Sequence, residues 1–411
     1  MNAFSLLNGE WACEQVALSD LAKQYGTPFY VYSLSRIESQ CQALRTAFAA
    51  HPTQICFAVK ACPTGGILRP VFQAGLGADV VSGGELTRAL RAGAPADKTV
   101  FSGVGKQDWE LALGLEHGIQ AFHVESPDEL GRLHHIASQK GQRARVRLRV
   151  NPNIDARTAP YIATGLHKTK FGISENQLED CVRLARSLPG VSLIGLSCHL
   201  GSQIQELKAF GEAAQRLVGW GTRLREGHPE LASLDIGGGL AVRYLDEKPP
   251  SVQDFAAALA PVSQAGFQLI LEPGRWIVAE AGWLVTRIVT LKSTPEKVFA
   301  VVDAAMNDLI RPSLYEAYHP IECVRPRKGD PQTVDVVGPV CETGDFLGLD
   351  RSLPPLQTGD LLAITHAGAY GSSMGSTYNS RPLPPEIAVR ATQSQCIRRR
   401  QKIDEIFALE T

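Results

Sequence analysis

The sequence predicts an α/β protein built from a parallel (β/α)8 barrel of the TIM type, followed by a C-terminal antiparallel β-domain. Three observations lead to this prediction. Eight short β-rich runs alternate with helical stretches, characteristic residues stand at the end of each run, and the residue pattern changes after about position 280. We expect residues 1–26 to join the β-domain, residues 27–280 to form the barrel and residues 281–411 to form the β-domain.

The eight runs have the length and composition of short buried strands. They are Ile55–Ala61, Ala78–Gly83, Thr99–Val104, Ala121–Ser126, Val146–Asn151, Leu193–Gly201, Ser233–Leu240 and Leu269–Arg275. The stretches between them space their apolar residues as a helix does, as seen in Glu85–Ala92, Pro127–Gln139 and Glu206–Arg225. Repeats of this kind predict a parallel barrel, in which active-site residues lie where the strands end.

Polar side chains or glycines occupy these strand ends, and they are difficult to explain as core residues. They are Lys60, Asp79, Ser102, Glu125, Arg149, His199, Gly237–Gly239 and Glu272. Because the strands of a barrel end at one rim, these residues predict a common site there. We include Asp79 and Arg149 among its cofactor contacts.

Segments beyond the barrel alternate apolar and polar residues between Pro- and Gly-rich turns, which is typical of antiparallel strands. They are Trp283–Leu291, Phe299–Asp303, Thr333–Val337 and Leu361–Thr365. Within the barrel, the connection Pro152–Pro189 is longer than a usual loop. We expect it to hold its own helix and a cover for the active site.

Composition excludes several classes of function. The chain has 41 Lys and Arg against 42 Asp and Glu, so it lacks the basic excess of a nucleic-acid or membrane-surface partner. No apolar run approaches the roughly 18 residues of a membrane span, and Met1–Gly9 lacks the features of a secretory signal. The nine cysteines form no C-x-x-C pair, which favours a reducing cytoplasm over a disulfide framework or a zinc site.

Lys60 follows the apolar run Cys56-Phe57-Ala58-Val59. Burial lowers the pKa of an amine and favours Schiff-base chemistry. For a lone lysine, a charged strand end that reaches solvent is the commoner case. The residues at the other strand ends favour a buried amine that forms a Schiff base.

Two later loops have the features of a phosphate site. Gly237-Gly238-Gly239 follows a strand and can present backbone N–H groups to an anion, and phosphate sites in barrels favour the loops after strands seven and eight. The strand-eight loop is Glu272-Pro273-Gly274-Arg275, in which Gly274 can add an N–H group. Glu272 can pair with the protonated pyridine nitrogen of pyridoxal 5′-phosphate (PLP). The alternatives are a tight turn for the glycines and a surface ion pair between Glu272 and Arg275.

His199 and Ser202 lie in the segment Cys198-His199-Leu200-Gly201-Ser202. A histidine at a strand end can stack on a planar cofactor ring, and the serine can bind the cofactor phosphate. A hydrogen-bonded structural histidine is the alternative. His199 has no second ligand at a metal-binding spacing, so we expect no metal site.

Five further candidates lie in the predicted β-domain. Arg311 and Tyr315 are four residues apart, so on a helix they share a face and can bind a carboxylate. Cys341 and Glu342 lie in a glycine-bounded loop, where the thiol can deliver a proton and the carboxylate can bind an ammonium group. Tyr370 is flanked by small residues that permit close approach of a ligand. A buried structural cysteine and an ordinary turn tyrosine are the alternatives.

Together these residues resemble the fold-type III PLP-dependent decarboxylases, the group that contains ornithine and diaminopimelate decarboxylases, and the diaminopimelate decarboxylases most of all. The resemblance covers nearly the whole chain. The stretches that carry it are Phe57–Ala61, Ala78–Leu86, Tyr161–Ile173, His199–Ile204, Glu272–Arg275, Met306–Tyr318, Val337–Asp345 and Gly368–Pro382.

The resemblance implies an alanine racemase-like fold, a homodimer with shared active sites and the conversion of meso-2,6-diaminopimelate to L-lysine and carbon dioxide. It implies that Lys60 binds PLP covalently and that His199 stacks on the PLP ring. The two glycine-containing loops would hold the phosphate and the pyridine nitrogen. Cys341 matches the family's proton donor, supplied across the dimer interface. The residues that match substrate and cofactor contacts are Arg275, Arg311, Tyr315, Glu342 and Tyr370.

Several positions differ from the family pattern. Cys62-Pro63-Thr64 replaces the usual Asn-Ser-Asn, Ala159 and Ala163 replace a His and a Ser, and His167-Lys168-Thr169 replaces the common Lys-Glu-Asn. None of these removes a catalytic group, but they leave other substrates open, such as lysine, ornithine or an amino-acid conjugate of a siderophore or antibiotic pathway. A racemase and a non-catalytic PLP-binding regulator are further alternatives. Retention of Lys60, Cys341 and Glu342 together argues against the regulator.

Overall fold

The computed structural model describes residues 3–155 and 170–411. The chain divides into two compact units. The barrel unit comprises Gln40–Val242 and Lys248–Trp276, and the β-unit comprises Met1–Ser39, Arg243–Glu247 and Ile277–Thr411. The domain bounds expected from the sequence, at residues 26 and 280, stay a prediction.

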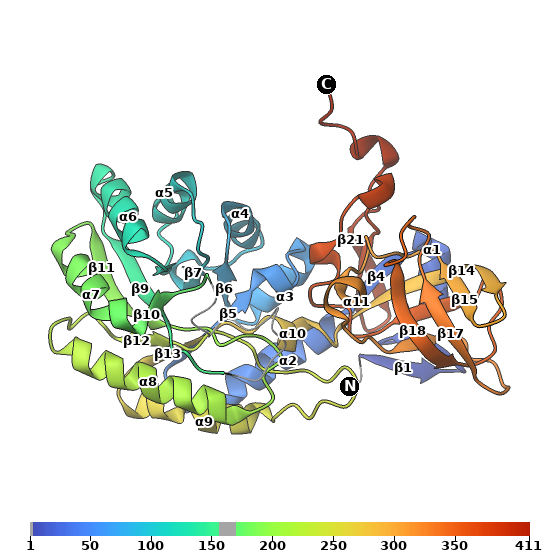
Figure 1. Cartoon of the computed structure of the whole chain (residues 1–411), viewed down its shortest axis with the longest axis horizontal. Coiled ribbons are helices and arrows are strands. Elements are labelled where there is room, and N and C mark those ends of the chain that lie inside the picture. The colour runs from blue at the N-terminus through green and yellow to red at the C-terminus, as the bar shows by residue number, and fades with distance from the viewer. Residues whose placement is uncertain (1–2, 156–169) are drawn as a thin grey trace. The chain divides into compact units, whose positions relative to one another are not determined.

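The barrel unit contains a closed ring of parallel strands (Figure 1). In ring order they are β5 (Thr53–Ala58), β6 (Gly77–Val80), β7 (Thr99–Phe101), β8 (Ala121–Val124), β9 (Ala144–Asn151), β11 (Val191–Ser197), β12 (Ser233–Asp235) and β13 (Gln268–Leu271). The ring closes because β13 pairs with β5. Each strand lies within or overlaps one of the eight predicted runs, so the predicted (β/α)8 barrel is confirmed.

Helices follow the strands and cover the ring. They are α3 (Gly65–Gln73), α4 (Gly83–Arg91), α5 (Asp108–Glu116), α6 (Pro127–Gln139), α7 (Leu178–Ser187), α8 (Leu207–Arg225), α9 (Val252–Gln264) and the short α10 (Arg275–Val278). Serine side chains begin three of them: Ser82, Ser126 and Ser251 each accept a hydrogen bond from the backbone N–H three residues later. Such caps satisfy an N–H group that has no partner inside the helix.

The long connection after β9 holds the helix predicted for it, α7, preceded by the two-residue strand β10 (Ile173–Ser174), which pairs with β9. The cover predicted for the active site lies outside the described residues. The same is true of Ala159, Ala163 and His167-Lys168-Thr169, which differ from the family pattern.

The β-unit is built on a second sheet with the strand order β18-β17-β15-β14-β4-β20-β21. The strand β19 joins it through β14, and β16 pairs with β19. Pairing is mostly antiparallel, but β15 with β17 and β4 with β20 are parallel. The predicted segments correspond to β14, β15, β17 and β19. The bounds are β4 (Phe29–Ser33), β14 (Gly282–Ser293), β15 (Val298–Val302), β16 (Ile321–Cys323), β17 (Gln332–Val337), β18 (Phe346–Leu353), β19 (Leu361–Ile364), β20 (Glu386–Arg390) and β21 (Gln393–Arg398).

N-terminal residues contribute to the β-unit. A three-stranded sheet forms from β1 (Phe4–Leu7), β2 (Glu10–Cys13) and β3 (Val16–Ala17), followed by α1 (Leu18–Tyr25). Phe4 stacks on Trp283 of β14 with ring centroids 3.9 Å apart, and both rings belong to one buried apolar cluster. This packing joins the first strand to the main sheet of the unit. The chain then passes from the β-unit into the barrel unit within α2 (Leu34–Ala47).

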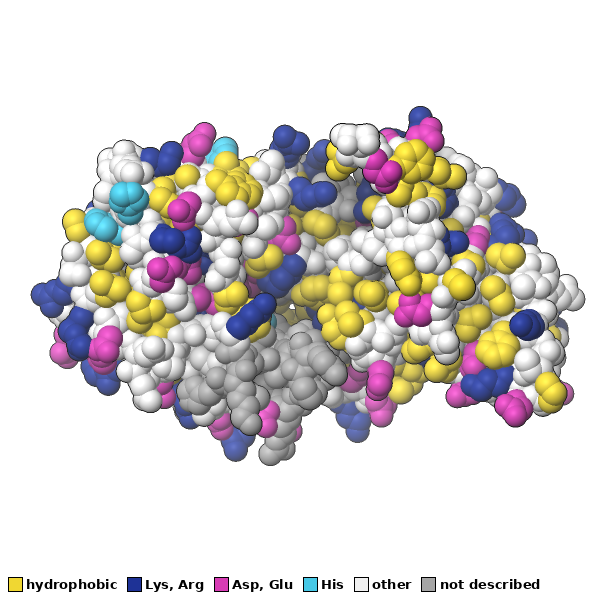
Figure 2. Space-filling view, turned by 45° about the horizontal axis from the view of Figure 1, so that its top comes forward, with side chains coloured by type: hydrophobic (Ala, Val, Ile, Leu, Met, Phe, Trp, Pro, Cys, Tyr) yellow, Lys and Arg dark blue, Asp and Glu magenta, His cyan; other side chains and the backbone are white. Residues whose placement is uncertain are grey.

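The surface carries charges of both signs. On the face shown in Figure 2, Lys and Arg side chains are interspersed with Asp and Glu side chains, as the formal net charge of −1 leads one to expect. Among the described helices, none has the length and hydropathy needed to span a membrane.

Candidate active site

Lys60 lies where β5 turns into a 3-10 helix, Val59–Ala61. Its Nζ donates a hydrogen bond of 2.6 Å to Oδ2 of Asp79 on β6, and the two strands bring these residues together because Ala58 and Asp79 are register partners. The Asp79 side chain is fully buried, whereas the lysine side chain is 37% exposed. Burial, followed by the charge of Glu272, raises the pKa of Asp79, and Lys60 opposes that rise. The amine is therefore held at the rim, within reach of a ligand.

The strand ends around Lys60 carry further charged groups, as predicted. Arg149 on β9 pairs with Glu125, which follows β8, at an Nη1–Oε1 distance of 2.9 Å. The same glutamate accepts hydrogen bonds from the backbone N–H groups of Gly103 and Gly172. Because three groups hold this carboxylate, the arginine that pairs with it is fixed at the rim rather than free to rotate.

The loop Gly237–Gly239, directly after β12, has no room for side chains. A Cβ atom on Gly238 would lie 2.2 Å from the carbonyl oxygen of Glu272. A Cβ atom on Gly239, whose φ is +109°, would lie 2.4 Å from the carbonyl oxygen of Gly201. Glycine is therefore required for the backbone to approach its neighbours this closely.

Backbone donors in these loops suit an anion. Gly237 N–H donates to Oδ1 of Asp235, and Gly238 N–H donates to Nδ1 of His199. Among the hydrogen bonds of the described residues, none is donated by the N–H groups of Gly239 and Gly274. Two such groups, in loops after the seventh and eighth strands of the barrel, fit the phosphate of PLP.

The loop after β13 brings Arg275 to Ser202. The guanidinium donates to Oγ of Ser202 from Nε at 3.1 Å and from Nη2 at 3.0 Å. The carbonyl of Pro273 accepts from the backbone N–H of Ala58, which ties this loop to the end of β5. The surface ion pair considered for Arg275 and Glu272 is not among the ion pairs of the described residues.

His199 lies beside the glycine loop as a neutral ring. Burial lowers its pKa to about 3, and the charges of Arg149 and Lys60 act in the same direction. A neutral imidazole offers an apolar face at neutral pH, and its Nδ1 accepts the hydrogen bond from Gly238. This geometry suits stacking against a flat ring.

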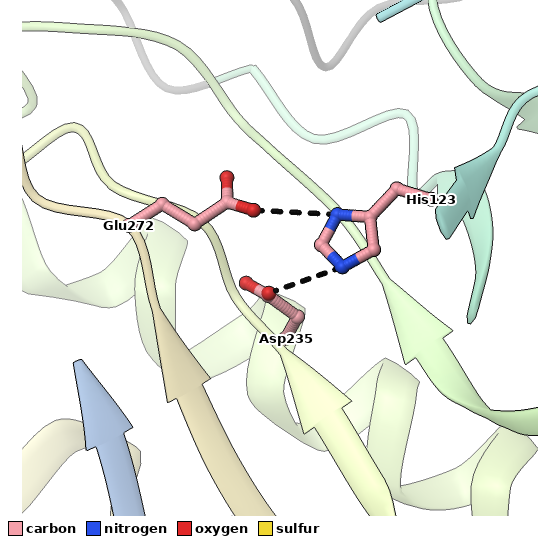
Figure 3. Close-up of side chains that lie close together, drawn as sticks. All are labelled: His123, Asp235 and Glu272. Carbon is pink, nitrogen blue, oxygen red and sulfur yellow. Dashed lines mark ion pairs between the residues drawn. The ribbon is translucent and has the colours of Figure 1, made fainter. Parts of the chain in front are cut away.

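Glu272, directly after β13, belongs to a cluster that the sequence did not predict. His123 of β8 lies between it and Asp235 of β12 (Figure 3). The Nδ1 atom is 3.3 Å from Oε1 of Glu272, and the Nε2 atom is 3.5 Å from Oδ2 of Asp235. Searching for ligand spacings along the chain does not find this group, because its members lie on three separate strands or strand ends. A polar residue inside the apolar run Phe122-His123-Val124 is the signal that a search could have used.

Two other charged groups near the site, the partly buried Glu85 and the buried Arg147, also escaped the sequence analysis. Glu85 of α4 accepts a hydrogen bond from the backbone of Val81, and burial raises its pKa to about 7. Arg147 of β9 is buried inside the barrel, where its Nε donates to Ser233. Burial lowers the pKa of this arginine, and the carboxylate of Asp235 opposes that change. The barrel interior is therefore charged beneath the rim.

In the β-unit, Arg311 and Tyr315 lie on the short helix α11 (Arg311–Tyr315). Arg311 is buried, and its Nη1 lies 2.8 Å from Nε2 of His319 and 3.2 Å from the hydroxyl of Tyr244. The other nitrogen of His319 faces the carbonyl of Thr365 at 2.9 Å. Since a carbonyl only accepts, Nδ1 carries the proton and Nε2 accepts from the guanidinium. Tyr315 is 37% exposed.

The remaining candidates lie elsewhere in the β-unit. Cys341 is exposed, so the alternative of a buried structural cysteine is wrong for this residue. Its backbone N–H donates to Asn379, while the Glu342 carboxylate accepts from the hydroxyl of Tyr378 at 2.9 Å. Tyr370 has a φ of +56°, an uncommon backbone conformation for a tyrosine that is frequent at functional sites.

Comparisons with known proteins cover both units. Residues 34–279 match the pyridoxal binding domain of the pyridoxal-dependent decarboxylases. The diaminopimelate decarboxylase of Pseudomonas aeruginosa is 47% identical over 412 residues, which cover 100% of this chain and 99% of the relative. That of Vibrio cholerae is 47% identical and covers 98% of this chain and 97% of its own. The crystal structure of the Helicobacter pylori diaminopimelate decarboxylase complexed with L-lysine matches with a TM-score of 0.93 and 39% identity, over 96% of this chain and 99% of that one.

Proposed function

Because the chain belongs to the diaminopimelate decarboxylases, within the family of pyridoxal-dependent decarboxylases, we propose that it releases carbon dioxide from meso-2,6-diaminopimelate and forms L-lysine. It is a PLP-dependent carboxy-lyase of lysine biosynthesis. The observation that carries the proposal is the arrangement around Lys60. Its amine is paired with buried Asp79 at the end of a barrel that also presents Glu272 and a glycine loop.

The barrel unit supplies the residues that would hold PLP. Lys60 would bind it covalently, Gly239 and Gly274 would donate backbone hydrogen bonds to its phosphate, and Glu272 would face its pyridine nitrogen. Pro273 belongs to the loop of Gly274, and Ser202 lies in the loop after β11. Asp79 and Arg149 would contribute from β6 and β9. When bound, PLP takes up the electron pair that remains as the carboxylate leaves. The protein keeps His199 neutral and holds the lysine amine at the rim.

The β-unit supplies groups of opposite charge for the far end of the substrate, which bears both an ammonium and a carboxylate. Arg311 would bind the carboxylate, with Tyr315 near it and Arg275 contributing from the barrel unit. Glu342 would bind the ammonium, and Tyr370 would contact substrate and cofactor. The support for Arg311 is its position: it is buried and its direction is fixed by His319. Lysine and ornithine lack the far carboxylate and would leave this charge unmatched.

We place the chain in a homodimer in which Cys341 returns a proton to the substrate carbon in the opposite active site. The exposure of this thiol supports the role. The β-unit also exposes Tyr318 and Leu349 along a groove of about 680 Å³, and exposed apolar patches mark interfaces. None of the nine cysteines forms a disulfide, which supports a cytoplasmic location.

An assay of carbon dioxide release from meso-diaminopimelate, lysine and ornithine tests the proposal. We expect diaminopimelate to react faster by at least roughly tenfold, because an unmatched buried charge costs about 2–5 kcal/mol. Arg311→Ala should lower turnover of diaminopimelate strongly and change the slow reaction of lysine little. Borohydride treatment should attach PLP permanently to Lys60. Faster reaction of lysine, ornithine or an amino-acid conjugate would contradict the substrate, and labelling of another lysine would contradict the role of Lys60.

A further inference from the structure

The cluster in Figure 3 is buried and includes Glu272, the carboxylate proposed to face the pyridine nitrogen. His123, Asp235 and Glu272 are 2%, 0% and 9% exposed. Their strands β8, β12 and β13 are not all neighbours in the ring, since β9 and β11 stand between β8 and β12. The imidazole therefore crosses the interior of the barrel to reach both carboxyl groups.

A fourth polar group, the hydroxyl of Ser102, indicates the direction of the hydrogen bonds. The buried hydroxyl of Ser102 donates to Oε1 of Glu272 at 3.4 Å and lies 3.1 Å from Nδ1 of His123. The same hydroxyl also interacts with the carboxyl group of Asp79. A serine has one hydroxyl proton, so with that proton on either carboxylate its oxygen accepts from Nδ1–H. In a neutral imidazole Nε2 then has no proton. It lies 3.5 Å from Oδ2 of Asp235, and both atoms are buried without a hydrogen-bond partner, so a proton on Asp235 would supply the missing donor.

The charges around the cluster agree with this assignment. The groups that act electrostatically on it are Asp79, Lys60, Lys106, Arg147 and Arg149. Lys106 and Arg149 have carboxylate partners of their own, Glu129 and Glu125. Lys60 and Arg147 remain against the carboxyl groups of Asp79, Asp235 and Glu272. Two positive charges and three acids balance when one acid keeps its proton.

Burial decides which form each group adopts. Burial, and then the charge of Arg147, lowers the pKa of His123 well below its ordinary value, so the ring is neutral. Burial, and then the charge of Glu272, raises the pKa of Asp235 well above its ordinary value. Burial also raises the pKa of Glu272, but Lys60, Arg149 and a hydrogen bond from Asp235 oppose that change. Of the two carboxyl groups, Asp235 is the one that keeps a proton.

The same three side chains place ligand atoms within 4.8 Å of one another, as a divalent metal ion requires. Two observations favour a hydrogen-bonded chain instead. The guanidinium of Arg147 acts on the carboxylate of Asp235 from inside the barrel. The charge balance described above is already complete without a further cation.

We propose that His123 is a positioning residue: Asp235 donates a proton to its Nε2, and its Nδ1–H is shared between Oγ of Ser102 and Oε1 of Glu272. Together with the Ser102 hydroxyl, it holds Glu272 so that the ionised carboxylate faces the pyridine nitrogen of PLP. This inference rests on the proposed function of Glu272. Figure 3 shows the second oxygen of this carboxylate directed away from the imidazole. A hydrogen bond to a charged group contributes about 1.5–3 kcal/mol, enough to matter for an acid that must stay ionised while buried.

Four variants test the direction of the hydrogen bonds through His123. His123→Leu removes both hydrogen bonds, and His123→Asn retains an N–H group near the position of Nδ1. Asp235→Asn can still donate to Nε2 and still accept from Gly237, whereas Asp235→Leu can do neither. Phe122→Leu is the matched control, because this neighbour on β8 packs on the opposite side, against Phe101 and Gly114.

The measurements are PLP affinity by fluorescence titration, the absorption spectrum of bound PLP against pH, and kcat and KM for meso-diaminopimelate. For His123→Leu and Asp235→Leu we expect PLP affinity to fall by about tenfold to a hundredfold. The absorption spectrum of bound PLP should change with pH at a lower midpoint than in the wild type. The kcat should fall while KM stays unchanged. The two asparagine variants should stay within about threefold of the wild type, and Phe122→Leu should match it.

Two outcomes would overturn the inference. One is a His123→Leu protein with the affinity and spectrum of the wild type. The other is an Asp235→Asn protein as impaired as Asp235→Leu, which would mean that Asp235 accepts rather than donates. If the leucine variants do not fold, Ser102→Ala decides, since it should move the spectral midpoint in the same direction by a smaller amount. Wild-type protein that binds no PLP would refute the proposed function instead.

Discussion

Single residues differ in how well the sequence predicts them. Lys60 and Glu272 stand in recognisable motifs, and each follows a strand of the barrel. His123 and Arg147 carry no such motif, because their importance arises only when the barrel closes and brings distant strands together. The sequence showed that residues at the rim are polar. It could not show that the interior beneath the rim is charged as well.

The depressed pKa of His199 predicts a pH dependence of stability in the cofactor-free protein. The pKa of His199 falls from its ordinary value of 6.5 to about 3 on folding. Between these two pH values the unfolded chain binds a proton at this residue and the folded chain does not. Stability is therefore lost as the pH falls from 6.5 towards 3. Between pH 7 and pH 5 the wild type should lose about 2 kcal/mol more than His199→Phe. Urea unfolding at both pH values measures these free energies. Equal losses in the wild type and in His199→Phe would contradict the prediction.

At the scale of elements, periodicity predicted the barrel strands and the three helical stretches that correspond to α4, α6 and α8, but not all of their ends. The glycine run was recognised, and its reason is steric: the loop after β12 lies against the loop after β13. Parallel pairing of β4 with β20 and of β15 with β17 was not predicted. Alternating sequence patterns reveal which face of a strand is buried and carry no information about the direction of its neighbour.

Gly238→Ala tests the close approach of these two loops. The added Cβ would meet the backbone of Glu272 at 2.2 Å, so one loop must move. We expect a loss of about 1–3 kcal/mol in the free energy of unfolding and a PLP affinity lowered by at least about tenfold. Gly219→Ala in α8 is the control, because its Cβ meets nothing within 4 Å. That variant should gain about 0.5–1 kcal/mol. Equal effects of the two substitutions would show that the loop tolerates a side chain.

At the scale of the whole molecule, the sequence predicted a barrel and a β-domain, and the chain has a closed barrel and a second sheet. The order of the chain is less simple than that division. The β-unit includes N-terminal residues, and Arg243–Glu247 belongs to it although the barrel continues afterwards. The sequence of the segment Arg243–Glu247 does not indicate its unit, because only its contacts assign it to the β-unit.

Subunit mixing tests the shared active sites. If Cys341 serves the opposite site, a heterodimer of Lys60→Ala and Cys341→Ala subunits has one complete site and one that lacks both groups. Random exchange of equal amounts should restore about a quarter of the wild-type activity, since half the dimers are mixed and each has one working site. Exchange is verified by co-purification of differently tagged subunits. Verified exchange without recovery would place both residues in the same subunit's site.

The division of labour between the two units affects how such a protein can diverge. The residues proposed to hold PLP lie in the barrel unit apart from Tyr370, and those proposed to select the substrate lie in the β-unit apart from Arg275. Mutations that alter α11 or the loop around Glu342 can therefore change the preferred amino acid while the residues proposed to hold PLP stay unchanged. Gene duplication followed by drift in these two segments is a short evolutionary route to a new decarboxylase.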